Sequence, residues 1–546
     1  MFVGIGSLYP QGTQVMFRPN RFFSFSFLLL FFIGGYAFGQ EMCPPRPRIG
    51  ATIPDPLRLH SENGVLSVDL TEVNNMGDDG TMHYCYLYAD GSEAPVLELN
   101  AGDQLIVNIT NHLTPLAGAM PGMAHGNTTP AANPCAGGDM TSASTNVHFH
   151  GLNISPKCHQ DEVIHTSIQP SDPPFQYKIQ IPKNDAPGLY WYHPHPHGFT
   201  TTQVVGGAAG ALIIDGIQNI RPEVAGLPER VFVIRQMFIP PPGSQPDPLN
   251  PSDNDSSPVT INFVPAFTNA GPPVLHMKPG TKQLWRILNA TSIYFLALQF
   301  KVDLVAQDLQ VIALDGIPLS APRSMDTVVI PPAGRAEFVV QVPPDGSFAQ
   351  FMNLGFDTGP IGDLNQGEIL ANVTIDSNAE VAHRIPSATK KMTDTRFAGL
   401  ATAKPTQVRK LYFSEQTHDG NTDFYLTVKG QTPRLYDPDN PPAIITQQGS
   451  VEDWILENHT GEVHAFHIHQ VHFVVLEING VPTNDPAPRD TVLIPYWDGV
   501  SKPFPSVKVR LDFRNPETAG TFLYHCHILD HEDGGMMAKI LVQRKN

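Results

Sequence analysis

Short apolar stretches that follow glycine-containing turns recur along the chain and predict β-strands. One such pattern occurs three times: a turn with a central glycine leads into an apolar stretch, and an asparagine follows the glycine by nine residues. The three copies run from Gly102 to Asn111, from Gly280 to Asn289 and from Gly449 to Asn458. Because self-similarity of this kind indicates repeated structural units, we predict three copies of one β module.

The far end of each module also recurs, as alternating stretches joined by a glycine-containing turn at residues 177–192, 337–351 and 508–524. In the first and last modules a histidine follows the turn glycine by five residues, at His193 and His525. The same step in the middle module reaches Phe351. We therefore predict that the middle module keeps the scaffold and has no metal site.

Two segments, residues 216–229 and 376–406, lack sustained alternation and carry proline, alanine and charge, which is typical of linkers. We find no long amphipathic helix. The sequence thus predicts an all-β fold of three antiparallel sandwich or barrel units in series, which we place at residues 40–215, 216–390 and 391–546.

The first 39 residues have the pattern of a signal peptide. An apolar run at residues 22–38 follows Arg18 and Arg21 and ends in a small-x-small motif. We expect cleavage before Gln40 and export, to the periplasm or the medium. A membrane anchor is the weaker alternative, because the run is short for a stable span. Met16 is an alternative start.

Composition narrows the possible partners. The chain has 34 Lys and Arg against 52 Asp and Glu, a net charge of −18. Without Arg18 and Arg21 the mature part stands at 32 against 52, or −20. We therefore expect no nucleic-acid partner. The 41% of hydrophobic residues argues against disorder.

Four of the five cysteines lie close together in the sequence, and the fifth lies far from them. Cys43, Cys85, Cys135 and Cys158 lie in the first third of the chain and could form two disulfides by any of three pairings. Of these we favour Cys135 with Cys158. Cys526 stands apart, and an odd cysteine in an exported chain indicates a thiol with a different task.

Ten of the 22 histidines fall in four tight groups: His148 and His150; His193 and His195; His464, His467 and His469; and His525, His527 and His531. In a strand, residues i and i+2 project from one face, so each His-x-His pair can present two imidazoles to one metal cluster. Eight neutral imidazoles without carboxylates suit copper, whereas Mg²⁺ and Ca²⁺ prefer oxygen ligands.

The same alternation places Cys526 on the face opposite His525 and His527, so its sulfur must serve a separate metal. His464, His531 and Met536 are available to complete that site. Two His, one Cys and a weak axial Met form the blue-copper set, which moves single electrons. The backbone joins Cys526 to ligands of the other cluster and so offers electrons a short route between the two sites. A one-electron site that feeds a multinuclear site predicts one-electron oxidation of a donor, with dioxygen as the acceptor.

These motifs resemble those of the multicopper oxidases, of the laccase and bilirubin-oxidase type, over residues 44–542. The ending at residues 525–537 is similar to that of bacterial laccases. The resemblance implies three consecutive cupredoxin-like Greek-key β-barrel domains and four copper ions per chain. Substrate electrons would enter at type 1 copper, and O₂ would be reduced to water at a trinuclear site between the first and third domains.

The resemblance also implies a ligand set for each copper. Type 1 copper would take His464, Cys526, His531 and axial Met536. Type 2 copper would take His148 and His467. The two type 3 coppers would take His150, His193 and His527, and His195, His469 and His525. The axial methionine suggests a low-to-middle redox potential.

Reduction of O₂ consumes protons, so an acid near the cluster is expected. Asp161 lies eleven residues after His150 and matches the acid that family members place beside type 2 copper. Glu532 directly follows His531 and is the second candidate. For both, the alternative is a structural or exposed carboxylate.

Several further residues have a simpler interpretation. His197 continues the His193 and His195 alternation, but the ligand set leaves it no vacancy, and we expect it to support the site without binding metal. His159, His165 and His472 lie near the ligand motifs and could orient imidazoles, but we favour no special role for them. A loop with Met120 and Met123, together with Met140, offers thioethers to Cu(I), but such loops are more often flexible insertions.

The leading function is a laccase-like oxidase of phenols and related aromatic donors, acting as a monomer. The nearest alternative is an oxidase of Cu(I), Fe(II) or Mn(II), which the short methionine loop and the acidic surface favour and the lack of a long Met-rich insert in the third domain opposes. A copper-free scaffold does not fit the complete ligand set. A copper nitrite reductase does not fit three repeats.

Overall fold

The computed structural model describes residues 41–116, 133–138, 140–237, 259–266, 271–379, 383–389, 396–418 and 420–545. The predicted signal peptide and the loop with Met120 and Met123 lie outside these residues, as does the predicted boundary after residue 390. Among the helices described, none is long and apolar enough to cross a membrane.

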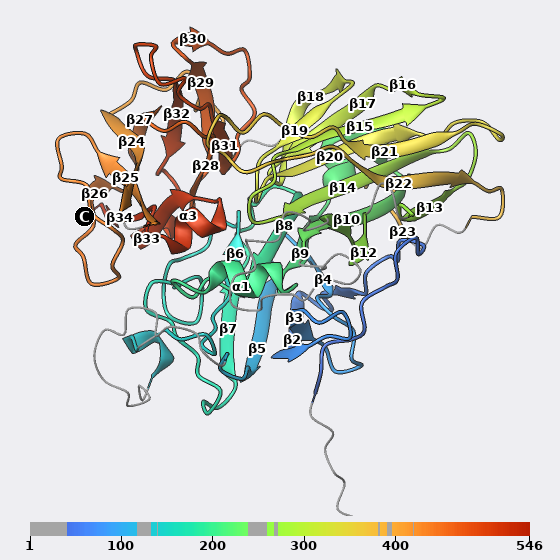
Figure 1. Cartoon of the computed structure of the whole chain (residues 1–546), viewed down its shortest axis with the longest axis horizontal. Coiled ribbons are helices and arrows are strands. Elements are labelled where there is room, and N and C mark those ends of the chain that lie inside the picture. Colours follow the sequence, from blue (N-terminus) through green and yellow to red (C-terminus); the bar gives the residue numbers. More distant parts are fainter. Residues whose placement is uncertain are drawn as a thin grey trace, which may run out of the picture. The chain divides into compact units, whose positions relative to one another are not determined.

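The described residues form six β-sheets, two in each of three successive units that can be followed by colour in Figure 1. The first unit has one sheet of β3 (Met82–Leu87), β2 (Val65–Met76), β5 (Gln104–His112) and β7 (Phe175–Gln180). Its second sheet has β1 (Arg58–His60), β4 (Val96–Asn100), β9 (Gly210–Asp215), β8 (Gly188–His193) and β6 (His148–His150).

The middle unit repeats this plan with longer sheets. One has β12 (Val264–Pro265), β11 (Val259–Ile261), β10 (Pro228–Gln236), β14 (Lys282–Ala290), β20 (Arg335–Gln341), β17 (Leu309–Leu314) and β18 (Ile317–Met325), with β23 (His383–Arg384) beside β10. The other has β13 (Val274–Met277), β22 (Glu368–Ile375), β21 (Ala349–Asn353), β15 (Leu296–Val302) and β16 (Val305–Ala306), with β19 (Val328–Ile330) beside β15.

The third unit has the same two layers. One sheet has β25 (Asn421–Val428), β24 (Gln407–His418), β27 (Val451–Asn458), β32 (Ser506–Asp512), β29 (Phe473–Ile478) and β30 (Val481–Pro482). The other has β26 (Ile444–Gln447), β34 (Met537–Gln543), β33 (Gly520–Cys526), β28 (His464–Ile468) and β31 (Thr491–Ile494).

Helical segments are short. The α-helices are α1 (Thr200–Val205), α2 (Ile217–Ile220) and α3 (Leu529–Asp533). The 3₁₀ turns are η1 (Pro134–Ala136), η2 (Pro222–Val224) and η4 (Pro516–Thr518). The predicted linker at 216–229 is therefore more ordered than its composition suggested, since it holds α2, η2 and the start of β10.

The repeated glycine and asparagine have the same structural task in all three units. Gly102, Gly280 and Gly449 have φ of 97°, 69° and 91°, a left-handed conformation that glycine adopts without steric cost. Each asparagine side chain then accepts a hydrogen bond from the backbone N–H two residues later, at Leu113, Thr291 and Thr460. The turn starts the strand and the amide ends it, which confirms the prediction of three related β units.

The strand between these two residues has the same neighbours in each unit. It pairs in parallel with β2, β10 or β24 and antiparallel with β7, β20 or β32. Each unit packs its own apolar core between its two sheets, and Trp285 and Trp454 are fully buried at equivalent positions of the middle and third cores. This rigid frame fixes the strands that carry the histidines.

The four cysteines of the first unit form two disulfides, Cys43–Cys85 and Cys135–Cys158. The favoured pair is thus confirmed, and the second pairing is resolved. Cys526 is free and fully buried.

Candidate metal centres

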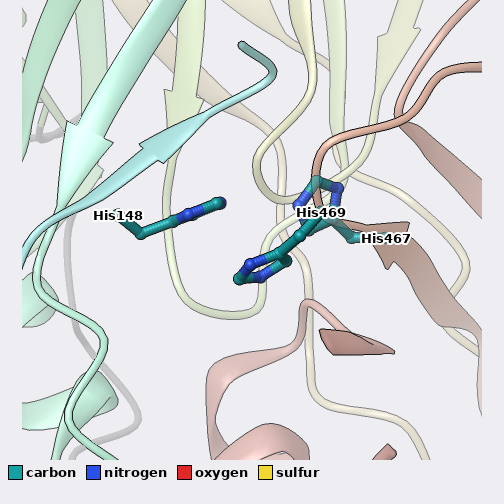
Figure 2. A group of neighbouring side chains, drawn as sticks. All are labelled: His148, His467 and His469. Atoms are coloured by element: carbon teal, nitrogen blue, oxygen red, sulfur yellow. The ribbon is translucent and has the colours of Figure 1, made fainter. Parts of the chain in front are cut away.

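The eight histidines of the four His-x-His motifs meet at one place between the first and third units. His148 and His150 lie on β6, where His148 pairs in register with His193 of β8. His467 of β28 pairs in the same way with His525 of β33. Figure 2 shows His148 reaching from one strand toward His467 and His469 on the opposite side. All eight side chains are at most 1% exposed.

Smaller groups within this cluster have metal-binding geometry. Ligand atoms of His195, His469 and His525 lie within 4.8 Å of one another, and so do those of His148, His467 and His469. The rings of His150, His193 and His527 have centroids 5.2 to 5.9 Å apart. The structure thus brings together the residues of each predicted ligand set, while the assignment of each to a copper stays a prediction.

The imidazole nitrogens at the centre of the cluster lack hydrogen-bond partners among the described residues. These atoms are Nε2 of His148, His193, His195 and His467, Nδ1 of His150 and His469, and both nitrogens of His527. Buried polar atoms are rarely left unsatisfied, so a converging set of them marks an unfilled requirement. A metal ion held by these lone pairs would meet it.

The opposite ring nitrogens are held in place. Nδ1 of His148 lies 3.0 Å from Asp161, Nδ1 of His193 lies 2.9 Å from the carbonyl of Pro194, and Nδ1 of His467 lies 2.9 Å from that of Asp490. Such bonds fix the tautomer of a metal-binding histidine. Burial lowers the pKa of His148 to about 3, so the ring is neutral and its free nitrogen carries a lone pair near pH 7.

Both carboxylates predicted from the sequence lie at this cluster. Asp161 is buried, and besides His148 it accepts hydrogen bonds from the backbone of Phe149 and from Gln470. Burial raises its pKa to about 7, against the lowering effect of these bonds. Glu532, on α3, lies 3.0 Å from Nδ1 of His525. Burial would raise its pKa, but the charges of His195 and His525 hold it well below its usual range.

A third carboxylate at the cluster was not predicted from the sequence. Oδ1 of Asp490 lies 3.2 Å from Nε2 of His150, and its carbonyl accepts from His467. Arg335 of the middle unit donates two hydrogen bonds, of 2.8 and 2.5 Å, to the Asp490 carboxylate. The middle unit therefore supports the histidine cluster through a buried charge pair. The only available indication was that Asp490 directly precedes a strand-like stretch.

The glycine after His150 is required by this pair. Gly151 has a φ of 87°, and a Cβ there would lie 2.5 Å from Arg335 and 2.7 Å from Asp490. His472 joins the same network, with Nε2 3.3 Å from the carbonyl of Asp315 and 3.6 Å from Asp490. It therefore has a structural role that the sequence did not indicate.

A separate site lies in the core of the third unit. Sγ of Cys526 is 3.6 Å from Nδ1 of His464 and 3.8 Å from Nδ1 of His531, and the two nitrogens are 3.3 Å apart. Met536 is fully buried in the same apolar cluster as Cys526, and its backbone bonds to both Cys526 and His531. The structure thus gathers the four residues predicted for type 1 copper.

The surroundings of this site fit a bound cation. Burial raises the pKa of the Cys526 thiol far above its usual range and lowers the pKa of His531 to about 3. A thiolate at this depth therefore requires a positive charge beside it, which a metal ion supplies. Phe413 and Phe424 stack on the rings of His464 and His531 and fix their planes.

Three other histidines that the sequence analysis singled out make contacts of a different kind. The backbone N–H of His197 donates to the sulfur of Met140, and its ring packs edge-on against Tyr436 at 4.8 Å. His159 stacks on Phe175. The backbone of His165 donates to Glu162.

The fold and these sites define a protein of three cupredoxin-like units with two candidate metal centres, one built around a cysteine and one around eight histidines. Three models of multicopper oxidase domains match the chain, at residues 139–219, 243–374 and 404–546. The chain belongs to the multicopper oxidase family and is an O₂-reducing oxidase of that family. The histidine clusters are consistent with its copper sites.

The relatives are distant. The multicopper oxidase Mco of Staphylococcus haemolyticus is 24% identical over 82% of this chain and 81% of its own. A laccase of Haloferax volcanii is 25% identical over 88% and 79%. A solved structure of a multicopper oxidase from Campylobacter jejuni, described as a metallo-oxidase, superposes with a TM-score of 0.66 at 23% identity over 92% of this chain and 96% of its own. This structural likeness supports the predicted fold.

Proposed function

We propose that this oxidase is laccase-like and takes single electrons from phenols and related aromatic donors at His531. The observation that carries the proposal is a carboxyl group beside an apolar surface at the outer edge of that residue. Oε1 of Glu462 lies 3.1 Å from Nε2 of His531. Ile361, which is 61% exposed, packs over Gly461, and Leu364 in the same loop is 68% exposed. An aromatic ring fits the apolar surface, and the Glu462 carboxyl group can form a hydrogen bond with the phenolic hydroxyl.

We assign the ligands as the sequence predicted. The Cys526 site would hold type 1 copper. The eight clustered histidines would hold one type 2 and two type 3 coppers, four copper ions per chain. When bound, copper would carry single electrons inward from the donor and deliver four of them to O₂, which becomes water.

Asp161 and Glu532 are the groups we propose for handling protons. Asp161 has a pKa of about 7, so near neutral pH it can both hold and release a proton while it orients His148. Glu532 stays ionised and orients His525. Its low pKa favours accepting hydrogen bonds over donating protons, so Asp161 is the better proton donor of the two.

A comparison of donors in two variants tests the aromatic assignment. We expect Ile361→Ser to raise KM for 2,6-dimethoxyphenol and to leave the rate with hexacyanoferrate(II), which has no ring, unchanged. Ile445→Ser is the control, because Ile445 is similarly exposed, at 52%, but lies on β26. An unchanged KM for the phenol in Ile361→Ser would contradict the proposal.

The second candidate function is oxidation of a metal ion. Glu415 hydrogen-bonds to Glu462, and Asp363 adds a third carboxyl whose charge acts on Glu462. Burial and these neighbours raise the pKa of Glu462 to about 9. A divalent or cuprous ion would favour this surface over solvent once the carboxyls ionise. If Glu415→Gln slows Cu(I) and Fe(II) oxidation strongly but spares the phenol, the metal-oxidase assignment replaces the laccase one.

We also propose that the mature protein is exported as a monomer that starts at Gln40. Two disulfides support export, because such bonds persist in oxidising compartments. N-terminal sequencing of the native protein and its mass in solution test both statements. Retention of residues 1–39, or a dimer, would contradict them.

A further inference from the structure

A cavity of about 410 Å³ lies away from the copper ligands, between the first and middle units. Its walls come from the segment after Cys43, from the turn before β4 and from β10 with the hairpin that follows it. They are mostly apolar, with contributions from Pro44, Pro47, Pro54, Leu57, Val96 and Val233. Its volume is in the range of small-molecule sites. It shares no lining residue with either metal centre.

Arg235, on β10, places in the wall of this cavity a positive charge that has no ion-pair partner among the described residues. Its side chain is 2% exposed, and it forms no ion pair with any described residue. One amino group donates to the carbonyl of Ala209, and Nε is buried with no hydrogen-bond partner. A buried cation in this state is costly, because the solvation that it loses is not replaced.

Four charged residues line the cavity: Arg46, Arg235, Asp90 and Glu93. Arg46 also lines it but is already paired with Glu93. Both guanidinium groups lie over the ring of Phe263, at 4.4 Å for Arg46 and 4.0 Å for Arg235. The Phe263 ring contacts the face of the Arg235 guanidinium and fixes its position. It provides no acceptor for the N–H groups, which point outward in the plane of the guanidinium. Asp90 is exposed to solvent and accepts a hydrogen bond from the backbone of Ser92, so within the buried wall Arg235 is the charge left to be balanced.

A further polar side chain of the wall, that of Asn262, already uses its hydrogen-bonding groups within the protein. Asn262 accepts from the backbone of Val233 and donates to the carbonyls of Pro54 and Val231. It therefore helps to shape the cavity and has no donor left for a ligand. A bound molecule would therefore be recognised by a hydrogen bond from Nε of Arg235 and by packing against the apolar walls.

We propose that this cavity binds a small organic anion, a carboxylate on a ring-sized apolar body such as an aromatic carboxylic acid. The carboxylate pairs with Arg235, since a planar guanidinium edge matches a carboxylate with two hydrogen bonds. The apolar body packs against the prolines and valines of the wall. The site is separate from the proposed donor site at His531 and does not depend on which donor the oxidase uses.

Calorimetric titration of the copper-loaded protein with benzoate tests the proposal. We expect saturable binding of one benzoate per chain and no binding of benzamide, which has the same shape and no charge. Inorganic phosphate should bind much more weakly, because it has no apolar body. Equal binding of benzoate and benzamide, or of phosphate and benzoate, would overturn the assignment, as would no benzoate binding.

Variants separate this cavity from any carboxylate binding at copper. We expect Arg235→Gln to weaken benzoate binding by about tenfold or more, as for the loss of one charge-assisted pair. Arg384→Gln is the control, since Arg384 is exposed on β23 and donates to the carbonyl of Gly226. Unchanged affinity in Arg235→Gln would contradict the proposal.

A second variant covers the case in which Arg235→Gln does not fold. Ser92 lines the cavity on the turn before β4, so Ser92→Phe fills part of it and keeps both arginines. We expect benzoate to raise the melting temperature of the native protein and not that of Ser92→Phe. Equal shifts would place benzoate elsewhere and overturn the proposal.

Discussion

The third and middle units share one scaffold, but the middle unit has phenylalanine at two places where the third unit has a histidine of a candidate metal centre. In the third unit His464 stands six residues after the repeated Asn458, and in the middle unit Phe295 stands six residues after Asn289. Phe295 is fully buried and stacks on Phe356 at 5.4 Å. An aromatic contact thus replaces a ligand at an equivalent place, and the strands around it keep their pairing.

The same replacement occurs at the other end of the units. His525 lies on β33, and its counterpart Phe351 lies on β21, where it packs against Trp285 at 5.1 Å. The middle unit nevertheless contributes to the metal centre. Its Arg335 donates two hydrogen bonds to Asp490, which in turn contacts His150 and His467. The scaffold therefore tolerates either a ligand set or an apolar core, and a unit without these histidines can still position them.

The largest expected effect separates the third unit from the other two. Cys526→Ser should abolish the blue colour and turnover while the protein remains folded, because a serine oxygen cannot replace the thiolate of a blue-copper site. Visible absorption and O₂ consumption measure the loss, and circular dichroism checks folding. Oxidase activity retained in this variant would refute the role of Cys526 in electron transfer.

The contribution of the middle unit is tested at Arg335. Arg335→Met leaves the Asp490 carboxylate buried and unpaired, and we expect it to lower the free energy of unfolding by about 3–5 kcal/mol. We also expect fewer copper ions per chain, as measured by metal analysis. Arg323→Met is the control: its partly exposed pair with Asp485 should contribute at most about 1 kcal/mol. Equal losses in both variants would mean that Arg335 has no special role.

The predicted absence of a metal site in the middle unit is tested by introducing a histidine. Phe295→His should lower the free energy of unfolding by about 1–3 kcal/mol, because the buried imidazole has no partner. Copper content should not change, since Phe351 still stands where the outer units have histidine. Phe295→Leu serves as the control for loss of the ring. An additional copper ion in Phe295→His would show that one residue is enough to make a site.

The smallest expected effect on stability concerns the side chains that accept hydrogen bonds from the two buried tryptophans. Trp454 donates to Glu452 at 2.8 Å, whereas Trp285 donates to the neutral Gln283 at 3.2 Å. Burial would raise the pKa of Glu452, but hydrogen bonds, first of all from Arg409, lower it. The stabilisation by its charge is therefore present above the ordinary pKa of 4.5 and lost as the pH falls through the folded value.

We therefore expect Glu452→Gln to cost about 1 kcal/mol or less at neutral pH and nothing in strong acid. Chemical denaturation at several pH values measures this difference. The cost of Gln283→Ala should be the same at each pH, because glutamine does not titrate. A pH-independent cost for Glu452→Gln would contradict the assigned pKa.

The sequence by itself determined the repeated β units and the residues that gather at both metal centres. The glycine and asparagine of each repeat act locally, through a left-handed turn and a bond two residues away, so their spacing is readable along the chain. The alternation of a strand likewise places Cys526 and His525 on opposite faces without knowledge of the fold.

The tertiary structure alone decided which distant side chains meet. Asp490 and Arg335 are 155 positions apart, and no local pattern marks either of them. The single charge of Arg235 is unremarkable in the sequence and gains meaning only because folding buries it without an ion-pair partner among the described residues and leaves its Nε without an acceptor. Local patterns report on neighbours along a strand, whereas hydrogen bonds and charge balance between units depend on how the sheets pack.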